Sequence, residues 1–192
     1  AGRLILLKNL KADGTIISSH DMTLDGAGNI TESLMDLPLL PTLPPAIGTM
    51  TYDNKNRISQ VGSDSYNHDQ TGRSITRTNA NDQYAYSFDV NDHITSITKN
   101  GVNQSSYNYD LNNNRISQTQ NGIETRYVVD QLAALPNVVA ETDGQGSMQR
   151  YYIYGDGLVS QIDTAGNSHY YHYDPTGHTL ALSDASGDVS DT

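Results

Sequence analysis

The sequence predicts an all-β fold in which β-hairpins follow one another in a solenoid or spiral sheet. A Tyr-x-Tyr-Asp pattern with a polar turn after it recurs along the chain, and the aspartates at 69, 89, 110 and 130 are 20, 21 and 20 residues apart. A fixed period of this size indicates stacked supersecondary units. Nineteen of the 22 acidic residues are Asp, which favours turns. Thirteen Tyr accompany one Phe and no Trp, which suits a thin, half-hydrated sheet.

The repeat is defined by its tyrosines and aspartates. Its clearest copy reads Tyr107-Asn-Tyr109-Asp110, followed by Leu-Asn-Asn-Asn and then Arg115. Since Asp and Asn hydrogen-bond to nearby backbone, we interpret each aspartate as a turn former. The repeat-defining residues over all copies are Tyr52, Asp53, Tyr66, Asp69, Tyr86, Asp89, Tyr107, Tyr109, Asp110, Tyr127, Asp130, Tyr171, Tyr173 and Asp174.

The segments between the aspartates are expected to be strands joined by tight turns. Tyr84, Tyr86 and Phe88 alternate with other residues, which places them on one side of an extended segment. Asn100-Gly101 and Asn121-Gly122 predict two-residue hairpin turns with positive φ at both positions. The interpretation is about one hairpin per repeat.

Aspartate and arginine recur four residues apart within the turns. Asp53 precedes Arg57 in this way, and Asp69 precedes Arg73. We expect each pair to meet across the tip of its unit and to fix register, because exposed pairs contribute little to stability. Some copies lack a turn glycine and carry residues that tolerate the left-handed conformation instead, namely Asn56, Asp92 and Asn114.

Two segments interrupt the repeat pattern. The segment 34–50 has four prolines and many leucines, which predicts an inter-repeat insertion without helix or central strand. It would be a plug or partner-binding segment, or a connection folded back over the sheet. The segment 132–140 predicts one helical turn before Pro136 and then a buried strand through Val138 and Val139.

Composition excludes several partners. A net charge of −11 argues against binding nucleic acid and against binding anionic lipid, since both need clustered Lys and Arg. No apolar run approaches the roughly 20 residues of a membrane span. The absence of cysteine removes disulfides, Cys-ligated metal sites and thiol nucleophiles.

Metal binding is not predicted. Asp110, Asn112 and Asn114 have the spacing of the first calcium ligands of an EF-hand, but Arg115 and Asn121 stand where that loop needs glycine and glutamate. Only weak calcium binding stays open. A second cluster is formed by histidines, of which positions 169 and 172 point to opposite faces of a strand, so they do not share one zinc ion. Its members are His169, His172, His178 and Asp174.

Catalytic chemistry is not predicted either. No serine stands in a Gly-x-Ser-x-Gly setting, and no glycine-rich phosphate loop precedes a helix. A pair of carboxylates for glycoside hydrolysis could come from distant repeats, although aspartates at repeated turn positions are better explained as turn formers. We therefore assign no catalytic, cofactor-binding or metal-binding residue and expect no cofactor.

The Tyr-Asp pattern with its Gly-Arg or Asn-Arg turn resembles the YD repeat of the Rhs family, which is shared with teneurins and with the C components of insecticidal toxin complexes. The resemblance covers essentially all of residues 1–192. It is strongest in three runs, which are Thr125-Arg-Tyr127-Val-Val-Asp130, Tyr151-Tyr-Ile-Tyr154-Gly-Asp-Gly-Leu158 and Tyr170-Tyr-His-Tyr173-Asp174-Pro-Thr-Gly177.

The resemblance implies part of a hollow, non-catalytic shell. Its partners would be flanking YD repeats and an enclosed C-terminal toxin domain, and its location would be secreted or on the bacterial cell surface. The self-cleaving aspartate site of the family belongs to a region downstream of these repeats, so no catalytic residue is carried over. Both ends fall within a repeat, so we expect a fragment.

Two other functions stay open at this stage. Exposed tyrosines and Asp/Asn turns could stack on and hydrogen-bond sugars, which would make the chain a carbohydrate-binding, adhesive or filament-forming repeat protein with glycans as partners. An enzyme is the third alternative. Open sheet edges also predict end-to-end self-association.

Overall fold

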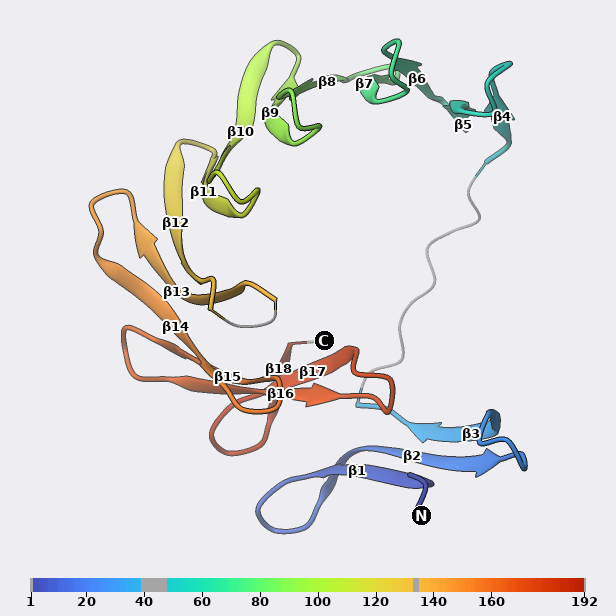
Figure 1. Cartoon of the computed structure of the whole chain (residues 1–192), viewed down its shortest axis with the longest axis vertical. Coiled ribbons are helices and arrows are strands. Elements are labelled where there is room, and N and C mark those ends of the chain that lie inside the picture. Colours follow the sequence, from blue (N-terminus) through green and yellow to red (C-terminus); the bar gives the residue numbers. More distant parts are fainter. Residues whose placement is uncertain (1, 39–47, 133–134, 192) are drawn as a thin grey trace. The chain divides into compact units, whose positions relative to one another are not determined.

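A computed structural model describes residues 2–38, 48–132 and 135–191, and within these ranges every regular element is a β-strand (Figure 1). The all-β prediction is confirmed. No helix that could cross a membrane occurs in the described part of the chain. The strands are β1 (Leu6–Leu10), β2 (Ile16–Leu24), β3 (Ile30–Asp36), β4 (Met50–Tyr52), β5 (Ile58–Val61), β6 (Asp64–His68), β7 (Ser74–Thr78), β8 (Gln83–Phe88), β9 (Ile94–Lys99), β10 (Val102–Tyr109), β11 (Arg115–Gln120), β12 (Ile123–Asp130), β13 (Asn137–Asp143), β14 (Met148–Tyr154), β15 (Leu158–Asp163), β16 (Ser168–Tyr173), β17 (Thr179–Ser183) and β18 (Val189–Asp191).

The strands form antiparallel meanders. One sheet has the order β1-β2-β3, and in the other sheet β4 to β18 follow one another in sequence order. The chain divides into two compact units, which are Ala1–Thr42 with Gln149–Thr192 (unit 1) and Leu43–Met148 (unit 2). Because a meander reverses direction at every turn, every second turn lies on the same side of the sheet, at the strand ends.

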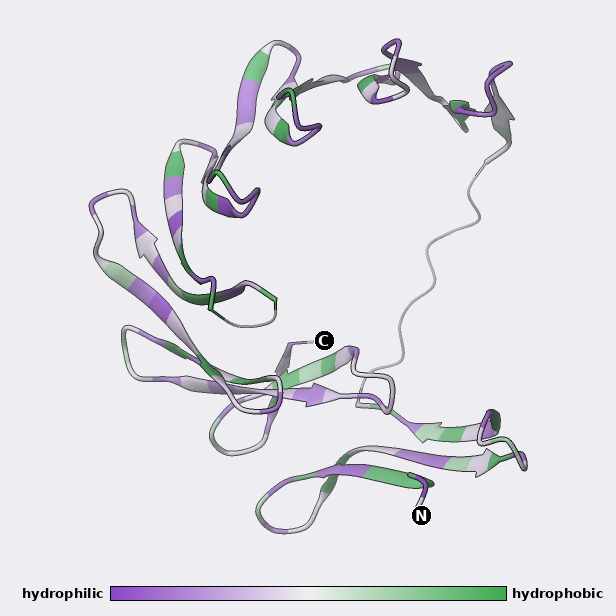
Figure 2. Ribbon diagram, viewed as in Figure 1, coloured by the Kyte–Doolittle hydropathy of each residue, from purple (hydrophilic) through white to green (hydrophobic). Residues whose placement is uncertain are grey.

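Unit 2 is a single sheet with very little apolar core. Its buried side chains are small, namely Ser105, Ser117 and Ala140, whereas Val102 and Ile123 are largely exposed. Figure 2 shows polar and apolar residues mixed along its strands. Hydrogen bonding between strands and contacts along the turns must therefore hold this unit, because burial of apolar area contributes little.

The hairpin turns have the predicted backbone. Asn100 and Asn121 both have φ of 51°, and the glycines after them have φ of 78° and 83°. The Lys99↔Val102 and Gln120↔Ile123 pairs close these two-residue turns. Among the predicted glycine substitutes, Asn56 (φ 59°) and Asp92 (φ 67°) are confirmed.

The third predicted glycine substitute was wrong by one position. The left-handed residue of that turn is Asn113, with φ of 67°, and not Asn114. Asn114 is the fifth residue of the turn, and its side-chain amide donates instead to Asp110 Oδ2 at 3.0 Å. Three Asn in a row left the position ambiguous in the sequence.

In unit 1, β1–β3 contacts the C-terminal hairpins. Asn9 Nδ2 donates to the carbonyl of Tyr173 at 3.3 Å, and Lys11 Nζ pairs with Asp188 at 2.5 Å. Side chains from both segments are buried, among them His20 of β2 and Ser183 of β17. Residues at opposite ends of the sequence thus share the core of this unit.

The two interruptions of the repeat are partly described. The strand β3 continues to Asp36 and β4 begins at Met50, so the predicted insertion 34–50 begins and ends in strand. Its central residues 39–47 lie outside the described residues, as do residues 133–134 of the predicted helical turn. The strand predicted through Val138 and Val139 is present as β13, with both side chains half-buried.

The half-buried imidazole of His172 should make folding stability depend on pH. Burial lowers the pKa of His172 from its ordinary 6.5, and its Nε2 lies 2.7 Å from Ser183 Oγ. The unfolded chain therefore binds this proton more readily, so stability should fall as the pH drops below 6.5. Between about pH 8 and 5 we expect the Tm of the His172→Gln variant to fall by less than the Tm of the unmodified chain. Identical pH profiles in thermal unfolding would contradict this role of His172.

Candidate functional site: a ladder of aspartate turns

The repeated aspartates build one kind of turn. The backbone N–H of each aspartate donates to the carbonyl four residues later, and the N–H three residues later donates back to the aspartate carbonyl. At Asp53 these two bonds measure 2.8 and 3.0 Å. This is a three-residue hairpin loop with a left-handed residue before the next strand. Nine described turns share it, beginning at Asp25, Asp53, Asp69, Asp89, Asp110, Asp143, Asp163, Asp174 and Asp184.

The carboxylate of each aspartate folds its own turn. In all nine, Oδ1 accepts the backbone N–H groups two and four residues later, at 2.8 to 3.0 Å. The side chain thus supplies an acceptor for backbone N–H groups that would otherwise bond to water. The aspartates are therefore turn formers, as predicted.

In seven of the nine turns the second carboxylate oxygen contacts the side chain of the fifth residue. Arg57 Nη2 lies 2.6 Å from Asp53 Oδ2, and Arg73 Nε lies 2.6 Å from Asp69 Oδ2, which confirms both predicted pairs. The backbone N–H and then the side chain of Arg57 lower the pKa of Asp53 from 3.8 to about 2. The carboxylate is thus ionised and paired over the whole physiological range.

The same arginines connect neighbouring turns. Arg57 Nη1 donates to the carbonyl of Asp69 at 3.1 Å. One repeat later, Arg73 Nη1 donates to the carbonyl of Asp89 at 3.3 Å, and its guanidinium lies 5.0 Å from the ring centroid of Phe88. The planar fork of arginine reaches both turns at once.

Other side chains make the connection further along the edge. The His93 ring stacks on Tyr109 with centroids 4.4 Å apart, and Tyr109 Oη donates to the carbonyl of Ile94 at 3.0 Å. The next turn is joined through Gln131, whose Oε1 accepts from Asn112 Nδ2 at 2.6 Å. We call this row of contacts, from Asp53 to Gln131 along one edge of unit 2, the turn ladder (Figure 1).

The predicted tyrosines lie in strands beside these turns. Tyr107 and Tyr127 flank Arg115, with its guanidinium carbon 5.6 and 5.3 Å from the two ring centroids. Tyr171 and Tyr173 stack with centroids 6.5 Å apart. The half-buried repeat-defining tyrosines are Tyr66, Tyr86, Tyr107, Tyr109, Tyr127, Tyr171 and Tyr173, whereas Tyr52 is exposed.

Asp130 occupies the corresponding place at the end of β12. Its Oδ1 accepts the backbone N–H of Leu132 at 2.9 Å, as at the start of the other turns. The residues that would complete the turn, 133–134, lie outside the described residues.

The histidines of the predicted cluster have separate partners. His169 Nδ1 lies 3.1 Å from Ser190 Oγ, and His178 Nδ1 lies 3.2 Å from Asp174 Oδ2. Within the described ranges, no three His, Asp or Glu side chains gather as they would around a metal ion. At the calcium-like spacing, Asp110 Oδ1 already accepts two backbone N–H groups.

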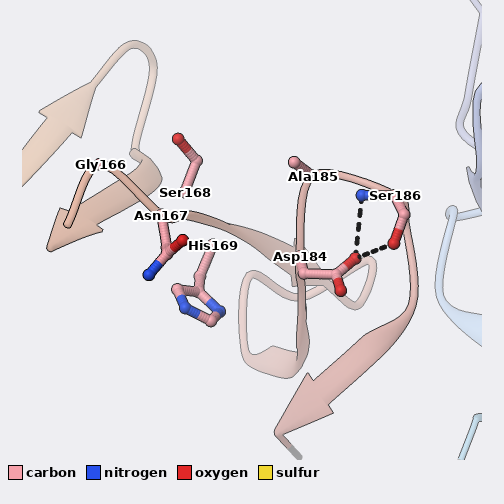
Figure 3. Close-up of a pocket in the computed structure, with 7 residues that line it drawn as sticks. All are labelled: Gly166, Asn167, Ser168, His169, Asp184, Ala185 and Ser186. Carbon is pink, nitrogen blue, oxygen red and sulfur yellow. Dashed lines mark hydrogen bonds between the residues drawn. The ribbon is translucent and has the colours of Figure 1, made fainter.

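A polar groove lies between two neighbouring turns of unit 1 (Figure 3). It encloses about 550 Å³ and is lined by residues of the turn before β16 and of the turn after β17. Asp184 Oδ1 accepts from Ser186 N and Oγ, and Asn167 Nδ2 donates to Asp163 Oδ2. Because these polar groups are satisfied within their own turns, they do not converge on a common ligand position.

Several of the nine aspartate turns were not predicted from the Tyr-x-Tyr-Asp pattern. Those at Asp25, Asp143, Asp163 and Asp184 have the same hydrogen bonds although no Tyr-x-Tyr precedes them. Each has glycine three residues after the aspartate, with positive φ. The Asp-x-x-Gly spacing was therefore the signal that could have found them.

A protein-family model described as Teneurin YD-shell matches residues 44–190. The "tRNA3(Ser)-specific nuclease WapA" of Bacillus spizizenii and the "tRNA nuclease WapA" of Bacillus subtilis are each 32% identical to this chain over 186 residues. The alignments cover 95% of this chain, which spans only 7% of the length of these relatives.

Two solved structures are similar over most of the chain. The Tc holotoxin pore of Photorhabdus luminescens aligns with a TM-score of 0.41 and 12% identity, over 95% of this chain and 13% of the other. A crystal structure of TcdB2-TccC3 aligns with a TM-score of 0.32 and 15% identity, over 93% of this chain and 8% of the other.

Removing one turn carboxylate should destabilise the fold. Asp110→Ala leaves the N–H groups of Asn112 and Asn114 without their acceptor, so we expect Tm to fall by about 2–4 °C or more. The matched control is Leu111→Ala in the same turn, because Leu111 is fully exposed and should be replaceable without loss. Thermal unfolding by circular dichroism measures both.

The effect of Asp110→Ala should also depend on pH. The hydrogen bond from the Asn114 side chain, above all, lowers the pKa of Asp110 below 3.8. The carboxylate therefore stabilises the fold above pH 3.8, and this contribution is lost as the pH falls through the lowered pKa. A Tm difference that stays constant into strong acid would show that the charge of Asp110 is irrelevant.

Proposed function

The chain belongs to the teneurin YD-shell family, and on this premise we propose that it forms part of the non-catalytic wall of a shell that encloses a toxin domain of the same protein. The family expected from the Tyr-Asp repeats is the one found. The observation that carries the proposal is the construction of unit 2, a single sheet fastened by turns along its edge instead of by a thick apolar core.

A thin sheet of this kind suits a wall. The buried residues of unit 2, such as Ser105 and Ser117, are small, so the layer has two faces and no wide interior. The turn carboxylates are saturated by their own backbone N–H groups, which leaves few reactive groups. Such a layer can separate two compartments without taking part in chemistry.

The names of the relatives support a toxic activity that lies elsewhere in the protein. Both relatives are named as tRNA nucleases, and this chain spans only 7% of their length. With a net charge of −11, the chain itself is poorly suited to bind RNA. We therefore place any nuclease or other toxin activity outside these residues and propose a protein that is secreted or held at the bacterial surface.

Glycan binding remains only an alternative. Tyr107 and Tyr109 belong to the repeated tyrosines that could stack on sugars, but Arg115 lies over the first ring and His93 stacks on the second. Tyr109 Oη is also hydrogen-bonded to a backbone carbonyl. These rings have protein partners where a sugar would stack, so no observation favours this function.

Limited proteolysis of the full-length protein tests the proposal. If the wall encloses a toxin domain, that domain should resist protease until the shell is opened. Combining Asp69→Ala with Asp110→Ala should weaken two rungs of the turn ladder and expose the domain, whereas Leu111→Ala should not. The readout is the rate at which mass spectrometry detects cleavage within the domain. A domain that is cleaved equally fast in all three proteins would refute enclosure.

Residues 1–192 alone should associate through open strand edges. In the described residues β4 and β18 end the long sheet, and each has one edge without a strand partner. Such edges pair readily with other strands, so we expect sedimentation velocity to show oligomers that grow with concentration. A monomer over the whole concentration range would contradict self-association while leaving the enclosure proposal untouched.

A further inference from the structure

The two Asn-Gly turns of unit 2 have the same backbone in the same kind of hairpin. Asn100 and Asn121 share a φ of 51°, and both are exposed. The backbone N–H of Asn100 donates to the carbonyl of Gln83 at 2.7 Å, and that of Asn121 donates to the carbonyl of Gln104 at 3.0 Å. Any difference between the two turns must therefore come from their side chains.

The side chain of Asn100 is held at both ends. Its Oδ1 accepts the backbone N–H of Gln83 at 2.8 Å, and its Nδ2 donates to Asp82 Oδ1 at 3.1 Å. The side chain of Asn121 makes no hydrogen bond to any residue that the structure describes. The residue before Gln104 is Asn103 instead of an aspartate, so the charged acceptor that fixes the Asn100 amide is replaced there by a neutral amide.

We propose that Asn121 is a site of spontaneous deamidation and isoaspartate formation, from which Asn100 is protected. The backbone nitrogen of Gly122 loses its proton and attacks Cγ of Asn121. The bond from Cγ to the amide nitrogen breaks, and ammonia leaves with that proton. Water then adds to either carbonyl of the cyclic imide and gives aspartate or isoaspartate, without any oxidant or reductant.

The local structure favours this reaction at Asn121. Glycine at 122 has no side chain to obstruct the attack, and its surroundings are open. The attack requires the asparagine amide to rotate toward the backbone nitrogen. The amide of Asn121 can do so directly, whereas the amide of Asn100 must first break two hydrogen bonds.

The product would alter the wall at one defined hairpin. Isoaspartate places the side-chain methylene in the backbone, which lengthens the turn between β11 and β12. The pairing Gln120↔Ile123 depends on a two-residue loop, because loop length sets hairpin register. Ageing of the protein would therefore loosen the sheet between β11 and β12 before it affects the turn at Asn100.

Peptide mass spectrometry after incubation in mildly alkaline buffer tests the proposal. We expect deamidation and isoaspartate to accumulate about tenfold faster at Asn121 than at Asn100, since two hydrogen bonds restrain the latter. Equal rates, or a faster reaction at Asn100, would overturn it.

Two controls show whether the rate difference comes from the folded structure or from the neighbouring residues in the sequence. Asp82→Ala removes the acceptor of Asn100 Nδ2 and should raise the rate at Asn100, whereas Lys99→Ala removes the ion pair of Asp82 and the cation–π contact with Tyr84 but leaves that acceptor in place, and should not. Circular dichroism checks that both variants fold. In denaturant the two sites should react at similar rates. A rate at Asn100 that ignores Asp82→Ala, or a difference that persists in denaturant, would contradict the restraint by hydrogen bonds.

Discussion

The hydrogen bonds from a turn to its leading aspartate are the interaction on which the rest of the structure depends. They fix each loop at three residues, of which the third is left-handed. At most of these turns the strand register also shifts by one residue just before the aspartate, as between Asn67 and His68 or between Asn108 and Tyr109, whereas the hairpin at Asp163 pairs without a shift. The shift decides which face of the sheet each following side chain occupies.

In a sheet that is held by its turns, stability comes from contacts between neighbouring turns and not from one common core. In unit 2 the buried side chains are small, and each turn contacts only the turns beside it. Repeat proteins of this kind gain stability from nearest-neighbour contacts, so length can grow without a larger core. Unit 1 differs, because β1–β3 contributes buried side chains against the C-terminal hairpins.

Different side chains at the fifth position of the turn bind the second carboxylate oxygen of the leading aspartate. Arginine at 57 and 73 binds its own aspartate and donates to the next turn, whereas His93 binds Asp89 and stacks on Tyr109. Asn114 binds only Asp110, and Asn112 with Gln131 supplies the onward contact. In these turns the fifth residue donates to the second carboxylate oxygen, and the connection to the next turn can come from another side chain; at Asp184 the fifth residue is Asp188, whose carboxylate has no donor.

The sequence alone determined the strands, through the alternation of their side chains. It also determined the Asn-Gly turns and the pairs Asp53–Arg57 and Asp69–Arg73, because these features arise within about five residues of chain. Tertiary structure decided which turns touch, such as His93 with Tyr109, and brought Asn9 to Tyr173 across 164 residues. Those contacts depend on the register of every strand between them, and most of the aspartate turns shift that register by one residue. The local sequence pattern therefore specifies each turn, and only the folded chain specifies which other turns it contacts.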